Sequence, residues 1–145
     1  MFEPTQKELE EWFMAIEDDD VDAVLEKVTK NPQLLGYYFE NAVFDDEFSG
    51  LSSELLGNKV GPLNPIQYAC FVESEDAALV LADHMSQEKL SEKWGGGNSL
   101  LHIASFNGMH RLVAKLIDKG VNPTSRNKQG YRPMDCVDDD LTREA

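Results

Sequence analysis

A short line of residues that returns after 33 positions constrains the fold of this chain more than any other feature. Residues 97–108 combine a glycine turn with a short apolar stripe, and Gly130 opens a similar line 33 positions after Gly97. Periods of roughly 20–50 residues are typical of solenoids made from repeated structural units. A single helix pair is too small to bury its own apolar face, so neighbouring pairs must stack on one another.

The repeat that begins at Gly97 predicts two helices separated by a turn. Leu100, Leu101 and Ala104 follow helical spacing, and Gly108 can break the chain between the two helices. Four apolar residues at i, i+1, i+4 and i+5 predict the core-facing side of the second helix: Leu112, Val113, Leu116 and Ile117. Gly120 fits the position just after a helix, where a left-handed backbone ends the last turn.

This segment resembles the ankyrin repeat, whose pattern runs G-x-T-P-L-H-x-A-A-x-x-G and continues into an apolar helix that ends L-L-x-x-G-A. The matching residues are Leu101, His102, Ala104, Gly108, Leu116, Ile117 and Gly120, whereas Ser99 replaces Thr and Leu100 replaces Pro. The resemblance implies an all-α ankyrin-repeat solenoid of about three and a half helix–turn–helix repeats. It also implies protein binding through a concave face formed by the first helices and the turn tips.

Two weaker copies precede the clear one. Residues 64–70 resemble the T-P-L-H-x-A-A run, with Gln67 at the histidine position and Glu73 where the pattern has glycine. The first copy opens with a capping box at residues 5–8 and stops at Asn31-Pro32, and its second helix has Asp20 as a candidate cap. We expect helices near residues 6–17, 20–30, 64–72, 76–85, 99–107 and 109–119.

These copies predict one ankyrin-repeat domain over residues 1–145. Its expected parts are a capping repeat at 5–32, an insertion at 35–59, repeats at 61–93 and 94–126, and a partial repeat at 127–145. The insertion is the most unusual segment, because it sets aromatic residues beside carboxylates: Phe44, Asp45, Asp46, Glu47 and Phe48. Two interpretations stay open: an arm that contacts a partner, or an extra helix or loop whose aromatic residues pack on the neighbouring repeats.

The charge is strongly negative and unevenly distributed. The chain has 27 acidic and 13 basic residues, a formal net charge of −14, and residues 1–56 hold 15 of the acids but only 3 of the bases. Such a surface repels nucleic acid and anionic membranes. It either favours a basic protein partner at the N-terminal half or serves solubility alone. We expect no nucleic-acid and no membrane partner, and a monomer or a component of a hetero-complex.

The two cysteines and the hydropathy pattern predict the compartment. Cys70 and Cys136 lie far apart in apolar surroundings and form no C-x-x-C pair, which suits a reducing compartment and small buried side chains. The chain start lacks the basic and apolar regions of a secretion signal, and no apolar run approaches the length of a membrane span. We expect the cytoplasm, the nucleus or both.

No group of residues predicts catalysis or cofactor binding. His102 could act as a base, but the resemblance implies that it hydrogen-bonds the turn backbone between repeats. The glycines at 95–97 lack the Gly-Lys-Ser/Thr of a phosphate loop, and the acidic run from Asp45 has Leu56 where a calcium loop needs glutamate. The histidines and cysteines show no zinc spacing. We expect no enzyme activity, no cofactor and no metal.

The repeat pattern also nominates partner-binding residues. They are Phe71, Val72, Phe106 and Asn107, which follow the alanine pairs, and the turn-tip residues Trp94, Asn98, Lys128, Gln129 and Tyr131. We expect Trp94, Phe106 and Tyr131 to be exposed, because the repeat pattern gives these positions no structural duty. Exposed aromatic residues are frequent hot spots, so these three would anchor the partner. In the alternative, Trp94 and Tyr131 pack on neighbouring turns.

Two functions fit these features. The first is a protein–protein interaction module or adaptor that uses the concave face and the turn tips. The alternative is a dedicated chaperone or escort for a basic protein of the ribosomal or histone-like kind. The two differ in how steeply salt weakens binding, because attraction between exposed charges is screened.

Overall fold

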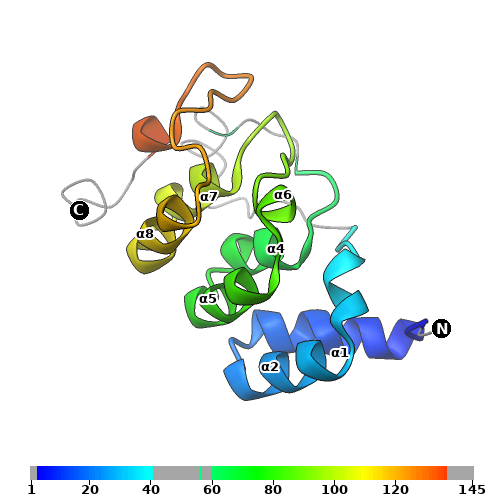
Figure 1. Cartoon of the computed structure of the whole chain (residues 1–145). Helices are drawn as coiled ribbons and strands as arrows, with labels where there is room; N and C mark the ends of the chain where they lie inside the picture. The colour runs from blue at the N-terminus through cyan, green and yellow to red at the C-terminus, as the bar shows by residue number, and fades with distance from the viewer. Residues whose placement is uncertain (1–2, 41–55, 57–59, 137–145) are drawn as a thin grey trace.

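The computed structural model of the chain describes residues 3–40, 56 and 60–136, and these residues form a stack of helix pairs. The pairs follow one another in chain order along the stack (Figure 1). They are α1 (Gln6–Glu17) with α2 (Val21–Lys30), α4 (Pro65–Phe71) with α5 (Glu75–His84), and α7 (Leu100–Phe106) with α8 (His110–Asp118). Each of the six predicted helices is therefore confirmed, with ends that differ by one or two residues at most.

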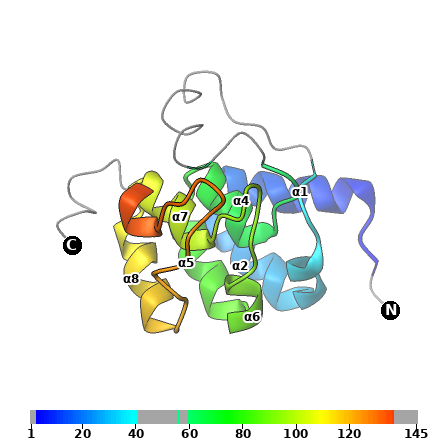
Figure 2. The ribbon, with the colours of Figure 1, turned by 90° about the horizontal axis from the view of Figure 1, so that it is seen from above.

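The six helices form two layers. Figure 2 shows the first helices of the pairs in one row and the second helices in another, and α1 contacts α4 as α4 contacts α7. The second helices are packed in the same order, α2 on α5 and α5 on α8. We call these the inner layer (α1, α4, α7) and the outer layer (α2, α5, α8).

Three shorter helical elements lie outside the helix pairs in the described part of the chain. The 3-10 turn η1 (Pro32–Gly36) follows α2, α6 (Gln87–Leu90) follows α5, and the 3-10 turn η3 (Pro133–Cys136) packs on α7. The sequence pattern did not predict η1 or α6. Pro32 ends α2 as expected, and its fixed backbone angle also suits the first position of the turn that follows.

The turns between paired helices share one backbone conformation. Asp19, Glu73 and Gly108 occupy equivalent positions and have φ angles of 54°, 63° and 69°. Glycine adopts this left-handed conformation at no steric cost, and aspartate tolerates it better than glutamate does. The glycine position of the repeat pattern is thus kept as a backbone shape even where the glycine is absent.

The apolar core lies between successive pairs and between the two layers. Trp12, Ile66, Leu101 and Leu116 are fully buried, and the predicted burial of Cys70 and Cys136 is confirmed. The expectation that Ile117 faces the core is wrong, because its side chain is 48% exposed. An outer helix packs along one stripe of its surface. Because successive residues are about 100° apart around a helix, Ile117 is turned away from the stripe that buries Leu116.

One polar position ties each inner helix to its own turn. Gln67 Oε1 accepts the Asn64 N–H at 2.9 Å, and His102 Nδ1 accepts the Ser99 N–H at 2.9 Å. The opposite ends of these side chains reach further along the chain: Gln67 Nε2 donates to the Glu92 carbonyl near the end of its own repeat, and His102 Nε2 donates to the Tyr131 carbonyl of the following partial repeat. The structural role implied for His102 is confirmed.

The outer helices receive their N-terminal caps across the repeat boundary. Asp19 Oδ1 accepts the Ala77 N–H in the first turn of α5 at 2.7 Å, and Glu75 Oε2 accepts the Leu112 N–H in the first turn of α8 at 3.2 Å. The residues that precede α5 and α8 make no side-chain cap of their own. Helix α2 instead has its own cap, because Asp20 accepts the Ala23 N–H as predicted.

Candidate protein-binding surface

The ends of the inner helices line up along one edge of the stack. The residues that terminate α1, α4 and α7 are Asp18, Val72 and Asn107, each at the same place in its repeat. Phe71 and Val72 are half-buried, as a partner-contacting pair requires, whereas Asn107 also has a structural duty. Its amide donates to the Cys70 carbonyl at 2.8 Å and so joins α7 to α4.

The expectation that Phe106 is an exposed anchor is wrong. Its side chain is only 9% exposed and belongs to the apolar core. Phe106 is the last residue of α7, and the equivalent Phe71 at the end of α4 is half-buried while Glu17 at the end of α1 is exposed. This position is therefore progressively covered along the stack, which the repeat pattern does not reveal.

The turn tip that was expected to present Trp94 and Asn98 buries both residues. Trp94 is 3% exposed and its indole N–H donates to the Ser99 carbonyl at 3.2 Å. Asn98 is fully buried: its amide donates to the Leu56 carbonyl, and its Oδ1 accepts from the Asn127 amide. The exposure expected for Trp94 is wrong, because the two residues pair their backbones and close a small turn on the core.

The other nominated tip residues are accessible to different degrees. Lys128 and Gln129 are exposed, and Tyr131 is half-buried. The Tyr131 carbonyl accepts from both His102 and the Asn127 N–H, so its backbone is structural even though part of its ring faces solvent. The predicted arm residues of the insertion lie outside the described residues: Phe44, Asp45, Asp46, Glu47 and Phe48.

Helix α1 has an acidic face. Glu10, Met14, Glu17 and Asp18 are exposed at helical spacing, and Met14 alone exposes 53% of its surface. None of the three carboxylates forms an ion pair within the part of the chain that the structure describes. We call these four residues the acidic face.

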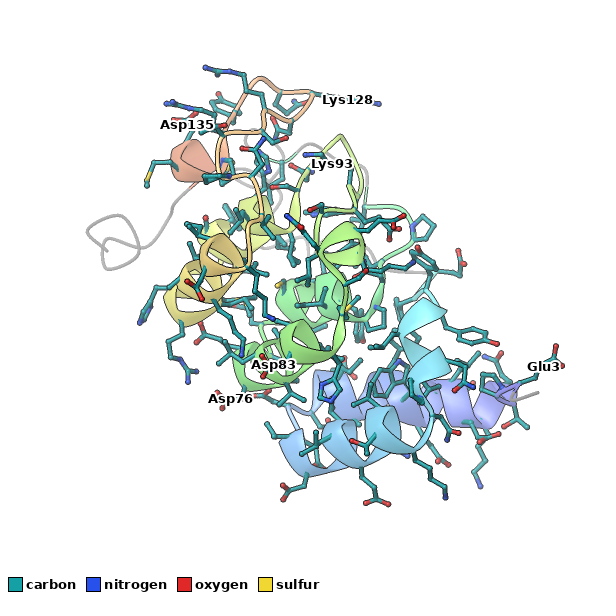
Figure 3. The ribbon with its side chains drawn as sticks, in the orientation of Figure 1. Glu3, Asp76, Asp83, Lys93, Lys128 and Asp135 are labelled. Carbon is teal, nitrogen blue, oxygen red and sulfur yellow. The ribbon has the colours of Figure 1, made fainter. Side chains whose placement is uncertain are left out.

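Three acidic residues of α5 form ion pairs with basic residues of α8. Arg111 on α8 pairs with Glu75 and Asp76 on α5 at 2.9 Å, and Lys115 pairs with Asp83 at 2.7 Å. Figure 3 shows Asp76 and Asp83 on α5, while Lys93 and Lys128 lie at the turn-tip end of the molecule. Exposed carboxylates without an ion pair among the described residues thus lie on both helices of the first pair, Glu10 and Glu17 on α1 and Asp22 and Glu26 on α2.

A cavity of about 420 Å³ opens beside the acidic face. Its walls include Leu9 and Phe13 from α1 and Tyr37 and Phe39 from the segment after η1, with Glu10 and Glu40 among the lining residues. The sequence analysis missed this pocket. The run of three aromatic residues at 37–39 was visible, but only the fold shows that it lies against α1.

The described residues form no arrangement with evident chemistry. Burial raises the pKa of the Cys70 thiol, and burial together with nearby Asp135 raises the pKa of Cys136 to about 12, so neither thiol ionises readily. Within the described ranges, no three histidine, cysteine or carboxylate residues are grouped to hold a metal ion. None of the helices described is long and apolar enough to cross a membrane.

Comparison with known proteins finds solved structures with a similar fold. No protein-family model and no curated protein matches the sequence. The structure is similar to the ankyrin repeat domain of Bcl-3, a member of the IkappaB family, with a TM-score of 0.57, 17% identity and coverage of 92% of this chain. The chain spans about half of that domain, 49% of its length.

The second relative comes from a complex. The structure is similar to yeast Yar1, solved as the chaperone of the ribosomal protein Rps3, with a TM-score of 0.63 and 19% identity. The similarity covers 98% of this chain and 86% of the other.

Proposed function

Because the chain has the ankyrin-repeat fold, we propose that it is a protein-binding module without catalytic chemistry of its own. Solenoids of this kind offer an extended surface made of equivalent positions from successive repeats, which suits contact with another protein.

The acidic face carries this proposal. It places an exposed apolar side chain, Met14, among carboxylates that have no ion-pair partner within the described residues. Apolar contact supplies burial, and charge complementarity speeds encounter and selects the partner. The partner that fits this combination is a basic protein segment with at least one apolar side chain.

A second function, escort of a basic protein, is favoured by one further observation. Yar1, a similar structure over most of its length, is the chaperone of a ribosomal protein. A chaperone role for this chain would place the same acidic face against the basic partner until the partner is delivered. The module and the escort differ in the number of partners, since an escort has one.

Affinity capture with the full chain tests the proposal. Tagged protein is used to capture partners from an extract of the source cells, and mass spectrometry identifies them at two salt concentrations. The proposal expects enrichment of basic proteins that is lost at high salt, and a single dominant basic partner would favour the escort. Absence of any specifically enriched protein would contradict both functions.

A matched pair of variants locates the surface. Met14→Ala/Glu17→Gln removes one apolar contact and one charge from α1, and Leu25→Ala/Glu26→Gln removes the same from the exposed side of α2. We expect the first variant to lose most of the captured partner and the second to retain it. Equal capture by the two variants would place the binding surface elsewhere.

A further inference from the structure

Two aromatic residues that line the cavity beside the acidic face, Phe13 and Phe39, are fixed by contacts with residues 63–68. Phe39 exchanges both backbone hydrogen bonds with Leu63, at 2.7 and 2.9 Å. Its ring stacks on Tyr68 with centroids 4.4 Å apart, and Phe13 meets both rings edge-on at 5.5 and 5.4 Å. A pocket preformed in this way binds with little loss of conformational freedom in the protein.

The charged residues known to line the cavity are acidic. Of the lining residues that the structure describes, Glu10 and Glu40 are charged and none is a lysine or arginine. Two described lysines have carboxylate partners of their own: Lys7 lies 4.0 Å from Glu11, and Lys89 pairs with Glu92 at 3.6 Å. Within the described residues, Glu10 accepts a hydrogen bond only from the neutral Gln6 amide, at 3.3 Å.

A cation already sits on an aromatic ring of the same segment. The Lys89 ammonium lies 4.9 Å from the centroid of Tyr38 and donates to the Tyr38 hydroxyl at 2.8 Å. This intramolecular contact shows that Tyr38, which also lines the cavity, accepts a positive group. Such contacts strengthen when the cation leaves water.

We propose that this cavity is a receptor for an arginine side chain on a basic segment of the partner protein. The guanidinium would lie against the rings of Tyr37 and Phe39 and donate to the carboxylates of Glu10 and Glu40. The aliphatic part of the arginine would cover Leu9 and Phe13. This proposal rests on the proposed protein-binding function and names the chemistry of its partner.

Arginine fits the cavity better than lysine for physical reasons. Its planar guanidinium stacks on aromatic faces and offers five N–H donors in a fork that matches a carboxylate, whereas an ammonium is compact and strongly hydrated. The cavity volume of about 420 Å³ lies within the usual range for ligand sites. It accommodates one long side chain, so the rest of the segment would lie across the acidic face.

Peptide binding to the full chain tests the proposal directly. The probes are fluorescein-labelled nona-arginine and nona-lysine peptides, followed by fluorescence polarisation at physiological salt. We expect the arginine peptide to bind about fivefold more tightly than the lysine peptide, because a partly desolvated guanidinium–aromatic contact is worth about 1 kcal/mol. Similar affinities for the two peptides would overturn the proposal.

Variants separate the cavity from general charge attraction. Glu10→Gln/Glu40→Gln should weaken the arginine peptide about tenfold, whereas Asp22→Asn/Glu26→Gln on α2 removes the same charge and should cost less than about threefold. Tyr37→Leu keeps an apolar wall and should remove the preference for arginine over lysine. Equal losses from the two double variants would leave only non-specific attraction and overturn the receptor.

These experiments distinguish failure of the arginine receptor from failure of the proposed protein-binding function. If Glu10→Gln/Glu40→Gln keeps both its arginine preference and its captured partner, the cavity has no such role while the binding function stands. If the unmodified chain captures no protein, the binding function itself fails whatever the peptides do.

Discussion

His102 and Gln67 occupy the same position in successive repeats and make the same pair of hydrogen bonds with different side chains. Each accepts an N–H from the residue that caps its own helix and donates to a backbone carbonyl 25 or 29 residues further along the chain. His102 can do both only as the neutral tautomer with its proton on Nε2. Burial lowers the pKa of His102 from its ordinary value of 6.5, an effect that outweighs the hydrogen bond to Tyr131.

Stability should therefore depend on pH through His102. Because its pKa is lower in the folded chain, the stabilisation is complete above about pH 6.5 and is lost as the pH falls through the folded pKa. His102→Gln copies the side chain of Gln67, so this variant should lose less stability than the wild type between about pH 7 and pH 5. Urea midpoints at several pH values measure the difference, and parallel curves would contradict the assignment.

Glu73 adopts a backbone conformation that suits glycine. Its side chain is exposed and its φ is 63°, a conformation that costs a non-glycine residue about 1–2 kcal/mol. Glu73→Gly should stabilise the chain by about 1 kcal/mol after the entropy of glycine is subtracted. Glu73→Ala removes the same carboxylate and keeps the strain, so denaturant unfolding that shows equal gains for both variants would assign the effect to charge.

At the scale of elements, the sequence pattern predicted the helices well because their ends carry local signals. The capping box at Thr5, the proline after Asn64 and the glycine after Lys119 act within one or two turns of the chain. Contacts between repeats carry no such local signal. The burial of Trp94 depends on the turn that it closes with Asn98, and the cavity exists only because residues 37–39 lie against α1.

Helix α8 contains one confirmed and one wrong prediction of burial, at adjacent residues. Leu116 is fully buried and Ile117 is 48% exposed, although both fit the predicted apolar side. Leu116→Ala should cost about 2–5 kcal/mol, because it removes buried surface and leaves a cavity. Ile117→Ala should cost less than about 1 kcal/mol, since surface changes away from special features have small effects. Guanidinium unfolding compares the two, and equal costs would contradict the packing described for α8.

At the scale of the whole molecule, the repeats are joined by polar contacts as well as by the apolar core. The caps of α5 and α8 come from the turn of the preceding repeat or the start of its outer helix, through Asp19 and Glu75. Ser74, which precedes α5, donates its hydroxyl to the Glu17 carbonyl instead of capping its own helix. Each later helix pair is therefore incomplete without its predecessor.

Removing the cap of α5 should weaken the boundary between the first two pairs. Asp19→Ala is expected to cost about 1–2 kcal/mol and to reduce the hydrogen-exchange protection of the Ala77 amide, whereas Asp19→Asn keeps an acceptor and should cost little. Asp18→Ala is the neighbouring control. Asp18 ends α1 next to its partially negative C-terminus, so its removal should be neutral or slightly stabilising. Identical behaviour of the two alanine variants would contradict a cap that spans the repeats.

The direction of this dependence matches the order in which a ribosome delivers the chain. The first pair carries its own cap at Asp20, so the N-terminus of α2 needs no cap from later residues. When α5 is synthesised, the Asp19 that caps it has already been made, and Glu75 likewise precedes α8. The outer helices can thus be capped one at a time during synthesis, whereas burial of the apolar face of each pair still requires its neighbour.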